Sequence, residues 1–354
     1  IFKNYMKVSN YIGWDIGGAH LKVASVDASG KVKLVEQFAT PLWQGLEQLE
    51  EAFPKLIDRL PDGTLSHALT MTAELVDIFK DRQSGMVAII NLCEKVLGSN
   101  ISLYAINGGV SSLSNASHRL EQLASANWHA SATYAASLVD AGLFVDVGST
   151  TTDIIPFSNK LVNARGIDDQ SRLRFDELVY TGAVRTPLMT LTKQVPFAGE
   201  WQNLAAEYFS NTADVYRVLG YLEDGDDLME TADGCEKDIV SSIRRLARML
   251  GTDASDFEYS NRCWIKLAQY FEEAQLQLLT KSVLRVLTHV DAKNQKIVGA
   301  GVGCFLVKKI AQRLNISYME FSELCDVDSE LTHKCNTCAP AVAMAQLNRL
   351  SVVT

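Results

Sequence analysis

The sequence predicts an α/β protein with two domains, and three observations support this prediction. The chain has 354 residues, which is enough for two domains of ordinary size. Segments in which apolar and polar residues alternate, as in strands, are interspersed with segments that have helical apolar spacing. An opening pattern, in which a strand ends in apolar–Asp–apolar–Gly, occurs at Asp15 and again at Asp146. We therefore expect an internal duplication.

In the first half, residues 11–39 predict three strands, because apolar residues alternate with polar ones on both sides of a polar turn. Pro54 is expected to bend the helix that follows, and Gly98 to end the next one. The remaining expected elements are, in order, a helix at 43–60, a strand at 66–71, a helix at 84–98, a strand at 101–106, a loop at 107–112 and a helical pair at 113–139. Together they predict a first domain at 10–140.

The second half begins with the same kind of unit and predicts a second domain at 141–335. The last helix, at 339–350, is expected to pack back on the first domain. The elements expected in between are strands at 142–148, 151–157 and 160–166, a mostly helical insertion at 200–288, and the strand, glycine turn and helix of "NQKIVGAGVGCFLVKKIAQRLN".

Composition and charge exclude several classes of protein. The formal net charge of -9 argues against sequence-independent nucleic-acid binding, which needs a basic surface. No apolar run reaches the roughly 18 residues of a membrane span, and the start of the chain lacks the apolar core expected of a signal peptide. Seven cysteines, an odd number, favour a reducing cytoplasm over a disulfide framework. Cys335 and Cys338 form one CxxC motif without a second pair, which favours ordinary thiols over a redox or zinc site.

The first candidate for an anion site is "DIGGAHLK", at the end of the first strand. Gly17 and Gly18 have no Cβ atom, so their backbone N–H groups could approach a phosphate closely. Asp15 is a candidate ligand of hydrated Mg²⁺, and Lys22 could contact a phosphate as a point charge. His20 is either a proton carrier or a packing residue. Taken alone, such a segment is more often only a tight turn.

The second candidate is "DVGSTTTD", which pairs a glycine turn with a row of hydroxyl groups. Hydroxyl and backbone donors at such a turn would form a cradle for phosphate oxygens. A polar β-turn whose threonines simply favour strand is an equally good explanation of this segment alone. The candidate phosphate ligands are Gly148, Ser149, Thr150 and Thr151, and the candidate metal ligands are Asp146 and Asp153.

The third candidate is "GAGVG", with Gly299, Gly301 and Gly303 between a strand and a helix. Small residues there let a helix begin close to a sheet, with its N–H groups directed at a ligand. A dinucleotide-binding turn of the Rossmann type is disfavoured, because no βαβ unit follows and no acidic residue stands at the required distance.

The order of these three segments resembles that of the actin, Hsp70 and sugar-kinase superfamily, over about residues 10–340. That resemblance implies two RNase H-like domains that face one another across a cleft which holds phosphates and Mg²⁺. The "GGAH" loop departs from the threonine-bearing loop of sugar kinases, which weakens the case for ordinary ATP-dependent phosphoryl transfer.

A narrower resemblance comes from other segments: "LTMTAELVDIFKDRQSGM", "DDQSRLRFDELVYTGAVRTPLM", "LAAEYFSNTADVYRVLG", "TADG" and "RRLARMLGTD". They resemble the hydantoinase/oxoprolinase-related branch of tetrahydromethanopterin-linked C1-transfer pathway proteins. This resemblance implies a methanofuran-biosynthesis enzyme that joins an aminomethylfuran diphosphate to the phenol of tyramine or γ-glutamyltyramine and releases diphosphate. It implies Mg²⁺ as the cofactor and permits a homodimer.

Two further residues are candidates on weaker grounds. Glu74 could take the phenol proton or pair with a substrate amine, or it could be a first-turn carboxylate of a helix. Arg185 could grip diphosphate or a substrate carboxylate, or form a loop salt bridge. Asp169 and Arg172 are expected to form a surface or interdomain ion pair, with a role in the site as the alternative. The candidate catalytic residues are thus Glu74, His20, Asp15 and Asp146.

Two other functions remain open on the sequence alone. One is an ATP-dependent small-molecule kinase or an amidohydrolase of the oxoprolinase type, for which ATP would bind. The other is a non-catalytic nucleotide sensor or assembly protein. Neither alternative predicts a nucleic-acid or membrane partner.

Overall fold

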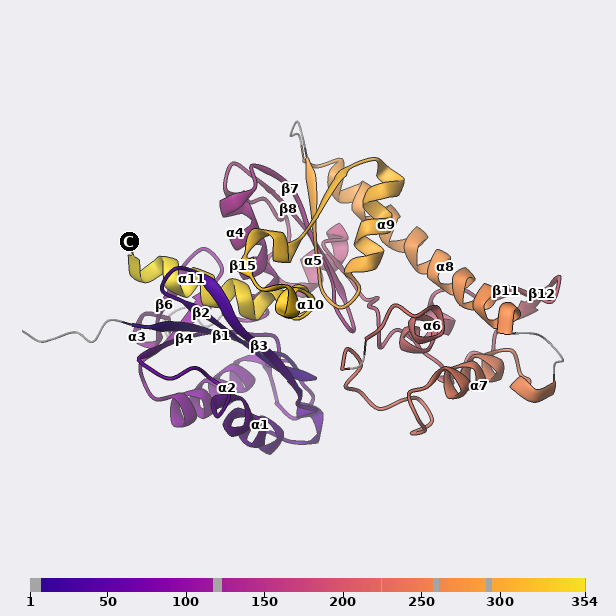
Figure 1. Cartoon of the computed structure of the whole chain (residues 1–354), viewed down its shortest axis with the longest axis horizontal. Helices are drawn as coiled ribbons and strands as arrows, with labels where there is room; N and C mark the ends of the chain where they lie inside the picture. Colours follow the sequence, from indigo (N-terminus) through magenta and orange to yellow (C-terminus); the bar gives the residue numbers. More distant parts are fainter. Residues whose placement is uncertain (1–7, 117–122, 224, 257–260, 291–294, 354) are drawn as a thin grey trace, which may run out of the picture.

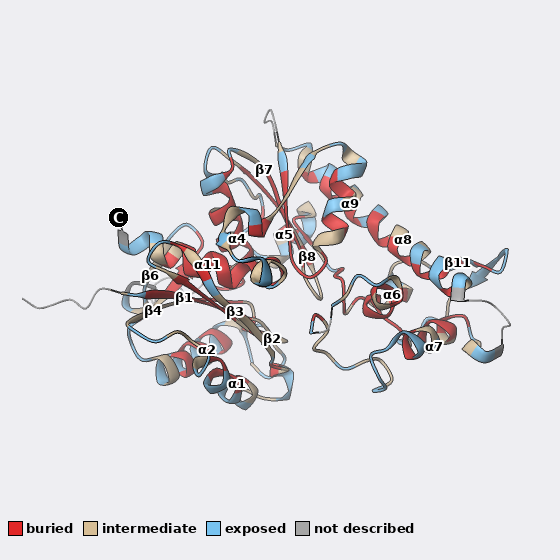
Figure 2. Cartoon of the chain, in the orientation of Figure 1, coloured by how far each residue is buried: buried red, intermediate tan, exposed pale blue. Residues whose placement is uncertain are grey.

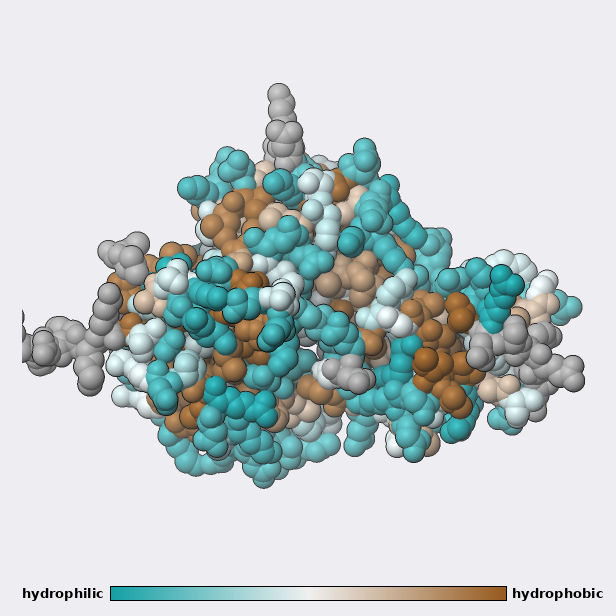
Figure 3. Space-filling view, viewed as in Figure 1, coloured by the Kyte–Doolittle hydropathy of each residue, from teal (hydrophilic) through white to brown (hydrophobic). Residues whose placement is uncertain are grey.

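The computed structural model describes residues 8–116, 123–223, 225–256, 261–290 and 295–353, and it contains two large mixed β-sheets with helices on their faces (Figure 1). Both sheets are buried at their centres (Figure 2). The face seen in Figure 3 is mainly hydrophilic, with an apolar area over the region of α6 and α7. In the described part of the chain, no helix is long and apolar enough to cross a membrane.

The first sheet has the order β15-β3-β2-β1-β4-β5-β6. Its strands are β1 (Asn10–Ile16), β2 (His20–Asp27), β3 (Lys31–Ala39), β4 (Leu65–Met71), β5 (Ile101–Ala105), β6 (Gly109–Ser112) and β15 (Asp326–Val327). Helices α1 (Glu47–Ile57) and α2 (Arg82–Leu97) share one core with this sheet. The terminal helix α11 (Ala339–Val353) packs on β1, β2 and β4. Gly13 permits this contact, because a Cβ atom there would lie 2.1 Å from the carbonyl oxygen of Ala341.

The second sheet has the order β10-β8-β7-β13-β14, with β9 paired to β8. Its strands are β7 (Ala141–Val147), β8 (Thr152–Ser158), β9 (Leu161–Val162), β10 (Leu178–Val179), β13 (Lys296–Ala300) and β14 (Ser317–Glu320). Helices α8 (Asn261–Leu287) and α9 (Cys304–Leu314) pack on it, and α4 (Asn127–Leu138) lies between it and α11.

The two sheets repeat one topology. In each, three strands are joined antiparallel and two more add in parallel beside the first, which gives β3-β2-β1-β4-β5 and β9-β8-β7-β13-β14. This repeat confirms the predicted α/β fold with duplicated RNase H-like units. The domain boundaries expected from the sequence stay predictions.

The region between β10 and β13 is mostly helical, as expected, but it also contains a β-hairpin. Its elements are the hairpin of β11 (Gln194–Phe197) and β12 (Glu200–Asn203), and the helices α6 (Thr212–Leu219), α7 (Ile239–Met249) and α8. Two ion pairs of the buried Arg245 link the elements of this region. Arg245 donates to Asp214 at 2.8 Å and to Asp233 at 3.0 Å.

Three local expectations differ from the structure. The predicted loop at 107–112 contains β6, which pairs with β5 after a turn in which Asn107 has a φ of 65°. The third strand of the second unit is limited to β9. It begins at Leu161, because Asn159 and Lys160 adopt left-handed turn conformations, and it ends at Val162. The helical pair contains α3 (Leu113–Ala116) and α4, and residues 117–122 between them lie outside the described part.

The remaining short elements are α5 (Asp169–Phe175), α10 (Thr332–Thr337), η1 (Leu42–Gln44), η3 (Leu188–Thr190), η4 (Ala254–Asp256), η5 (Phe321–Leu324) and η6 (Ser329–Leu331).

Candidate active site

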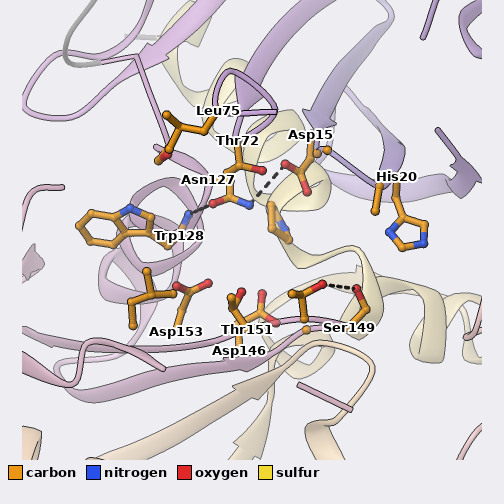
Figure 4. A pocket seen from close by; sticks show the side chains of 18 of the residues that line it. Asp15, His20, Thr72, Leu75, Asn127, Trp128, Asp146, Ser149, Thr151 and Asp153 are labelled. Carbon is orange, nitrogen blue, oxygen red and sulfur yellow. Dashed lines mark hydrogen bonds between the residues drawn. The ribbon is translucent and has the colours of Figure 1, made fainter. Parts of the chain in front are cut away.

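A pocket of about 370 Å³ lies between the β1–β2 hairpin of the first sheet and the β7–β8 hairpin of the second (Figure 4). The first residues of α4 and α5 complete its wall. Most of the candidate residues line it: Asp15, Gly17, Gly18, His20, Lys22, Asp146, Gly148, Ser149, Thr150, Thr151, Asp153 and Arg185. The pocket therefore unites the first two glycine loops, as their order in the sequence predicted.

Two buried aspartates face one another across the middle of this pocket. Asp15 comes from β1 and Asp146 from β7, at equivalent positions of the two hairpins. Burial raises the pKa of Asp15, while Lys22 and the Asn127 amide, 3.4 Å away, oppose that rise. Burial, together with the negative charge of Asp153, raises the pKa of Asp146 to about 7. The centre of the pocket thus has an excess of negative charge that favours a bound cation.

Lys22 is a cation whose charge acts on both of these carboxyl groups. Its Nζ atom donates a hydrogen bond to the carbonyl oxygen of Thr337 at 3.1 Å. Burial by itself lowers the pKa of Lys22, but the facing Cys338, Asp15 and Asp146 raise it overall. Lys22 therefore stays protonated and can contact an anion in the pocket.

Backbone hydrogen bonds fix the shape of the loop between β7 and β8. Arg185, from a later segment, brings a second cation to this loop. The Gly148 N–H donates to the Thr151 carbonyl oxygen at 2.9 Å, which closes the turn. The Arg185 N–H donates to the Ser149 carbonyl oxygen at 2.8 Å, and its guanidinium reaches the Thr150 hydroxyl at 3.4 Å. The Arg185 guanidinium also lies 5.4 Å from the ring centre of Trp43. Arg185 is thus directed at the hydroxyl-rich loop.

Asp153 is already neutralised by a partner. It forms a salt bridge with Arg172, which is buried and stacks 4.1 Å from the ring centre of Trp128. The predicted pair of Asp169 and Arg172 is therefore wrong, because Asp169 instead lies 3.6 Å from Arg82. This arrangement makes Asp153 a weaker candidate for a metal ligand than Asp15 or Asp146.

His20 is a neutral group of the pocket wall. Burial and, to a smaller extent, the nearby charges of Lys22 and Arg185 lower its pKa to about 3. Its Nε2 atom is buried and has no hydrogen-bond partner among the described residues. His20 is thus suited to hydrogen bonding with a ligand and unsuited to carrying a positive charge.

Glu74 lies behind the pocket wall instead of in it. Its carboxylate accepts a hydrogen bond from the Ser125 hydroxyl at 2.7 Å, and Ser125 is the residue that lines the pocket. Burial raises the pKa of Glu74, although Ser125 and Arg82 oppose the rise. Its Oε2 atom has no hydrogen-bond partner in the described part of the chain.

The third glycine segment does not line the pocket either. The Gly303 N–H donates to the Val147 carbonyl oxygen at 2.8 Å. A Cβ atom on Gly301 would lie 2.2 Å from the same oxygen, and one on Gly299 would meet the Tyr318 ring. These glycines therefore bring α9 and β13 close to their neighbours.

Several wall residues carried no sequence motif. Trp128 begins a helix that resembled an ordinary core helix, and Trp43 precedes another. The aromatic and apolar residues of the lining are Trp43, Leu75, Val76, Trp128, Leu178 and Tyr180. Leu75 and Trp128 lie toward Asp153, whereas Trp43 lies beside Arg185. Among the described residues, no group of three or more His, Cys, Asp or Glu side chains is arranged to hold a metal ion by itself. A metal here would need ligands from the substrate and water, as Mg²⁺ usually does.

The comparisons with known proteins agree with the sequence segments quoted above. The chain is 33% identical over 297 residues, 82% of its own length and 86% of the relative, to the (4-{4-[2-(gamma-L-glutamylamino)ethyl]phenoxymethyl}furan-2-yl)methanamine synthase of Methanocaldococcus jannaschii. It is 33% identical over 159 residues, 45% of its length and 70% of the relative, to the synthase of the same name from Methanococcus vannielii.

Solved structures align along nearly the whole chain at low identity. Component A of the Acidaminococcus fermentans (R)-2-hydroxyglutaryl-CoA dehydratase aligns with a TM-score of 0.47 and 9% identity, over 98% of this chain and 100% of that one. A ROK family glucokinase from Streptomyces griseus aligns with a TM-score of 0.47 and 13% identity, over 96% and 99%. The model of the hydantoinase/oxoprolinase family matches residues 66–340, and the chain belongs to that family.

Proposed function

We propose that this protein is a methanofuran-biosynthesis enzyme, which joins an aminomethylfuran diphosphate to the phenol oxygen of γ-glutamyltyramine and releases diphosphate. The names of the two relatives describe the product of such a coupling: a furan methanamine linked through a phenoxymethyl ether to a γ-glutamylated aminoethyl chain. The observation that carries the proposal is a single pocket that combines a cationic, hydroxyl-rich part with an aromatic part.

The cationic part suits a diphosphate. Lys22 of β2 and Arg185, from the segment after β10, supply positive charge from opposite sides of the pocket. Ser149, Thr150 and Thr151 add hydroxyl and backbone donors, and Gly17 and Gly18 leave room for close approach of the backbone. His20 contributes its unpartnered Nε2 atom as a neutral hydrogen-bonding group.

Magnesium fits the centre of the pocket. Asp15 and Asp146 offer hard oxygen ligands, and their combined charge exceeds that of the single facing Lys22. We assign the ion to these two carboxylates. Asp153 is a weaker candidate ligand, because it forms a salt bridge with Arg172. When bound, Mg²⁺ would neutralise charge that develops on the departing diphosphate.

The reaction balances without a further reactant. The bond between the furan methylene carbon and the diphosphate oxygen breaks, and a bond forms between that carbon and the phenol oxygen. The furan oxygen stabilises positive charge on the methylene, and the departing diphosphate takes up the phenol proton. The aromatic lining holds the two rings in line and excludes water, which would otherwise capture the cation.

The compartment and the partners follow from the same proposal. All seven cysteines are free thiols, as expected in a reducing cytoplasm. The partners are small molecules, and a homodimer stays a prediction.

Diphosphate release tests the proposal directly. The protein with Mg²⁺ is incubated with ATP alone, with ATP and 5-oxoproline, and with the furan diphosphate plus γ-glutamyltyramine. We expect diphosphate and the ether product, identified by mass, only in the third mixture. Turnover of ATP without ether formation would contradict the synthase and favour the kinase or amidohydrolase alternative.

A further inference from the structure

We propose that Arg82 and Asp169 recognise the α-amino acid group at the end of γ-glutamyltyramine, with Arg82 binding its carboxylate and Asp169 its ammonium. This inference rests on the proposed function and adds to it the residues that would distinguish the glutamylated phenol from free tyramine. It is carried by the ion pair between Asp169, which lines the pocket, and Arg82, which lies beside Asp169 on the other half of the molecule.

Arg82 and Asp169 come from different halves of the molecule. Asp169 lines the pocket and is the first residue of α5, which packs against β10 of the second sheet. Arg82 is the first residue of α2, which shares its core with the first sheet. Their side chains are 28% and 33% exposed, and the Arg82 Nη2 atom lies 3.6 Å from Asp169 Oδ2. The pair therefore stands where a ligand would meet solvent.

Arg82 is also available for a ligand. Its guanidinium lies 3.6 Å from Asp169 and 3.9 Å from Glu74, both beyond ordinary hydrogen-bond length. Among the described residues it donates no hydrogen bond, although a guanidinium has five N–H donors in a planar fork. Charge alone thus holds Arg82 between two carboxylates, and its fork can take a substrate carboxylate in a bidentate contact.

A carboxylate with an unsatisfied oxygen lies beside Arg82. Glu74 is fully buried next to Arg82, and its Oε2 atom accepts no hydrogen bond within the described part of the chain. A buried carboxylate oxygen without a donor is costly. Because Glu74 lies behind the pocket wall, it would act on an ammonium held by Asp169 through its charge and not through a hydrogen bond. The cluster therefore offers one cation and two anions, which complements the opposite charges of an α-amino acid.

The pocket arranges its parts in the order that the substrate requires. In Figure 4, Leu75 and Trp128 lie with Asp153 at the opposite end from His20 and Ser149, and Asp15 and Asp146 lie between the two ends. Asp169 belongs to the apolar end, because its charge acts on both Asp153 and Glu74. Diphosphate at the His20 end thus leaves the phenol ring against Leu75 and Trp128, with its tail directed at Arg82.

Free tyramine could not use this cluster in the same way. It has no carboxylate, so it gains nothing from Arg82, and its ammonium follows the ring so closely that it would lie near the Arg172 guanidinium stacked on Trp128. The geometry therefore favours a phenol that carries an α-amino acid group on a neutral amide tail.

Three phenols and four variants, the fourth being Arg82→Lys, test the assignment. The phenols are γ-glutamyltyramine, 4-aminobutanoyl-tyramine, which lacks the carboxylate, and glutaryl-tyramine, which lacks the ammonium. The variants are Arg82→Gln, Asp169→Asn and, as a matched control, Arg285→Gln, which breaks an exposed ion pair with Asp176 away from the pocket. For each combination, kcat/KM and the dissociation constant of the phenol are measured, and thermal unfolding verifies the fold.

We expect Arg82→Gln to lower kcat/KM for γ-glutamyltyramine by about 10- to 100-fold, the usual value of a charge-assisted contact, and to leave 4-aminobutanoyl-tyramine almost unaffected. Asp169→Asn should show the mirror pattern and spare glutaryl-tyramine. Arg285→Gln should change none of the three. Arg82→Lys, which keeps the charge and loses the fork, should fall between wild type and Arg82→Gln.

Equal losses for all three phenols would overturn the inference, because the pair would then only hold the two halves together. If the wild-type protein forms no ether with any phenol, the proposed function fails, and the dissociation constants decide the inference separately. Selective loss of γ-glutamyltyramine binding in Arg82→Gln would support it even then, and unchanged binding would refute it.

Discussion

The β1–β2 and β7–β8 hairpins have the same topology but opposite charge at one position. In the first, Asp15 pairs in register with Lys22; in the second, Asp146 at the equivalent position pairs with Asp153. The first hairpin therefore carries its own counter-ion. The second relies on residues from elsewhere, since Arg172 of α5 neutralises Asp153.

This difference explains why two aspartates in matching motifs do not titrate alike. Burial raises the pKa of both carboxyl groups, and Lys22 and Asp153 act on both. Lys22 is the larger of these two influences at Asp15, whereas Asp153 is the larger at Asp146, where the pKa rises to about 7. A duplicated motif thus preserved the position of the carboxylate and changed its neighbour. The two sides of the pocket therefore differ in charge. A bound cation should stabilise the Asp146 side more than the Asp15 side.

The largest expected effect comes from Asp146→Asn. If Asp146 holds Mg²⁺, the change should lower kcat/KM for ether formation by about 10³-fold, since it removes a preorganised charge at the leaving group. Diphosphate binding, followed by calorimetry, should also lose its dependence on Mg²⁺. An unaltered Mg²⁺ titration would remove Asp146 from the site.

Asp146→Asn should also change how the stability of the metal-free protein depends on pH. A folded-state pKa raised from 3.8 to about 7 means that the native state binds more protons over that interval, so metal-free wild type loses stability as pH rises through 7. Asp146→Asn lacks this loss and should gain stability relative to wild type between pH 5 and pH 8 in chelator. Asp15→Asn is the matched control and should gain less, because Lys22 already compensates Asp15.

Arg172→Met should lower the stability of the protein, because it removes the counter-ion of Asp153 in the second hairpin. Arg172 is buried, and its loss would leave Asp153 as an unpaired, mostly buried charge, which costs about 3 kcal/mol in free energy of unfolding. Urea unfolding measures this cost. Arg285→Met, which breaks an exposed pair with Asp176, should cost less than about 1 kcal/mol, and Arg172→Met/Asp153→Ala should recover part of the loss. Equal losses of unfolding free energy in Arg172→Met and Arg285→Met would show that Arg172 does not stabilise a buried charge at Asp153.

Local sequence patterns predicted the hairpins and therefore both aspartates. Strand period and turn residues act over a few positions, so the repeat of β1–β2 in β7–β8 was visible without the fold. The partner of Asp153 was not visible, because Arg172 of α5 reaches it only once β10, which follows α5, pairs with β8 beside Asp153. Trp128 was missed for a similar reason: at the start of α4 it has the pattern of a core residue, and only the packing of α4 between the two sheets brings it to the pocket.

The glycine segment at 299–303 shows another limit of sequence reasoning. Glycine permits close approach of the backbone, but the sequence does not say what approaches. Gly301 admits the Val147 carbonyl oxygen of β7, and the segment is used for packing of α9. Glu74 is a comparable case, because its position after β4 was predicted correctly and its burial behind Ser125 was not.

The two sheets should also respond differently to acid. Register places His67 of β4 beside Ile12, whereas Ile297 of β13 stands at the equivalent position beside Leu143. His67 accepts a hydrogen bond from Trp14 Nε1 at 3.1 Å, and burial lowers its pKa to about 4. The unfolded chain therefore binds more protons between pH 4 and 6.5, and stability falls as pH drops through that interval.

His67→Gln should remove about 2 kcal/mol of this pH dependence, after allowance for the partial exposure of the ring. Urea unfolding at pH 7 and pH 4.5 measures it, and hydrogen exchange should show β4 opening before β13 at the lower pH. An identical pH dependence in wild type and variant would mean that other groups, such as His129, cause the acid sensitivity.

The smallest expected effect concerns the hydroxyl groups that only the second hairpin carries. Where the first loop has Gly18 and Ala19, the second has Ser149 and Thr150. Ser149→Ala removes one donor to the diphosphate and should lower kcat/KM by about 3- to 10-fold, the value of one neutral hydrogen bond. The effect should lie in diphosphate binding, because the backbone bonds of the loop, from Gly148 and Arg185, do not involve the side chain. Ser158→Ala, at the far end of β8, is the control and should leave kcat/KM unchanged. A loss of 100-fold or more would mean that Ser149 contacts the reacting atoms, and the two hairpins would then differ in chemistry as well as in charge.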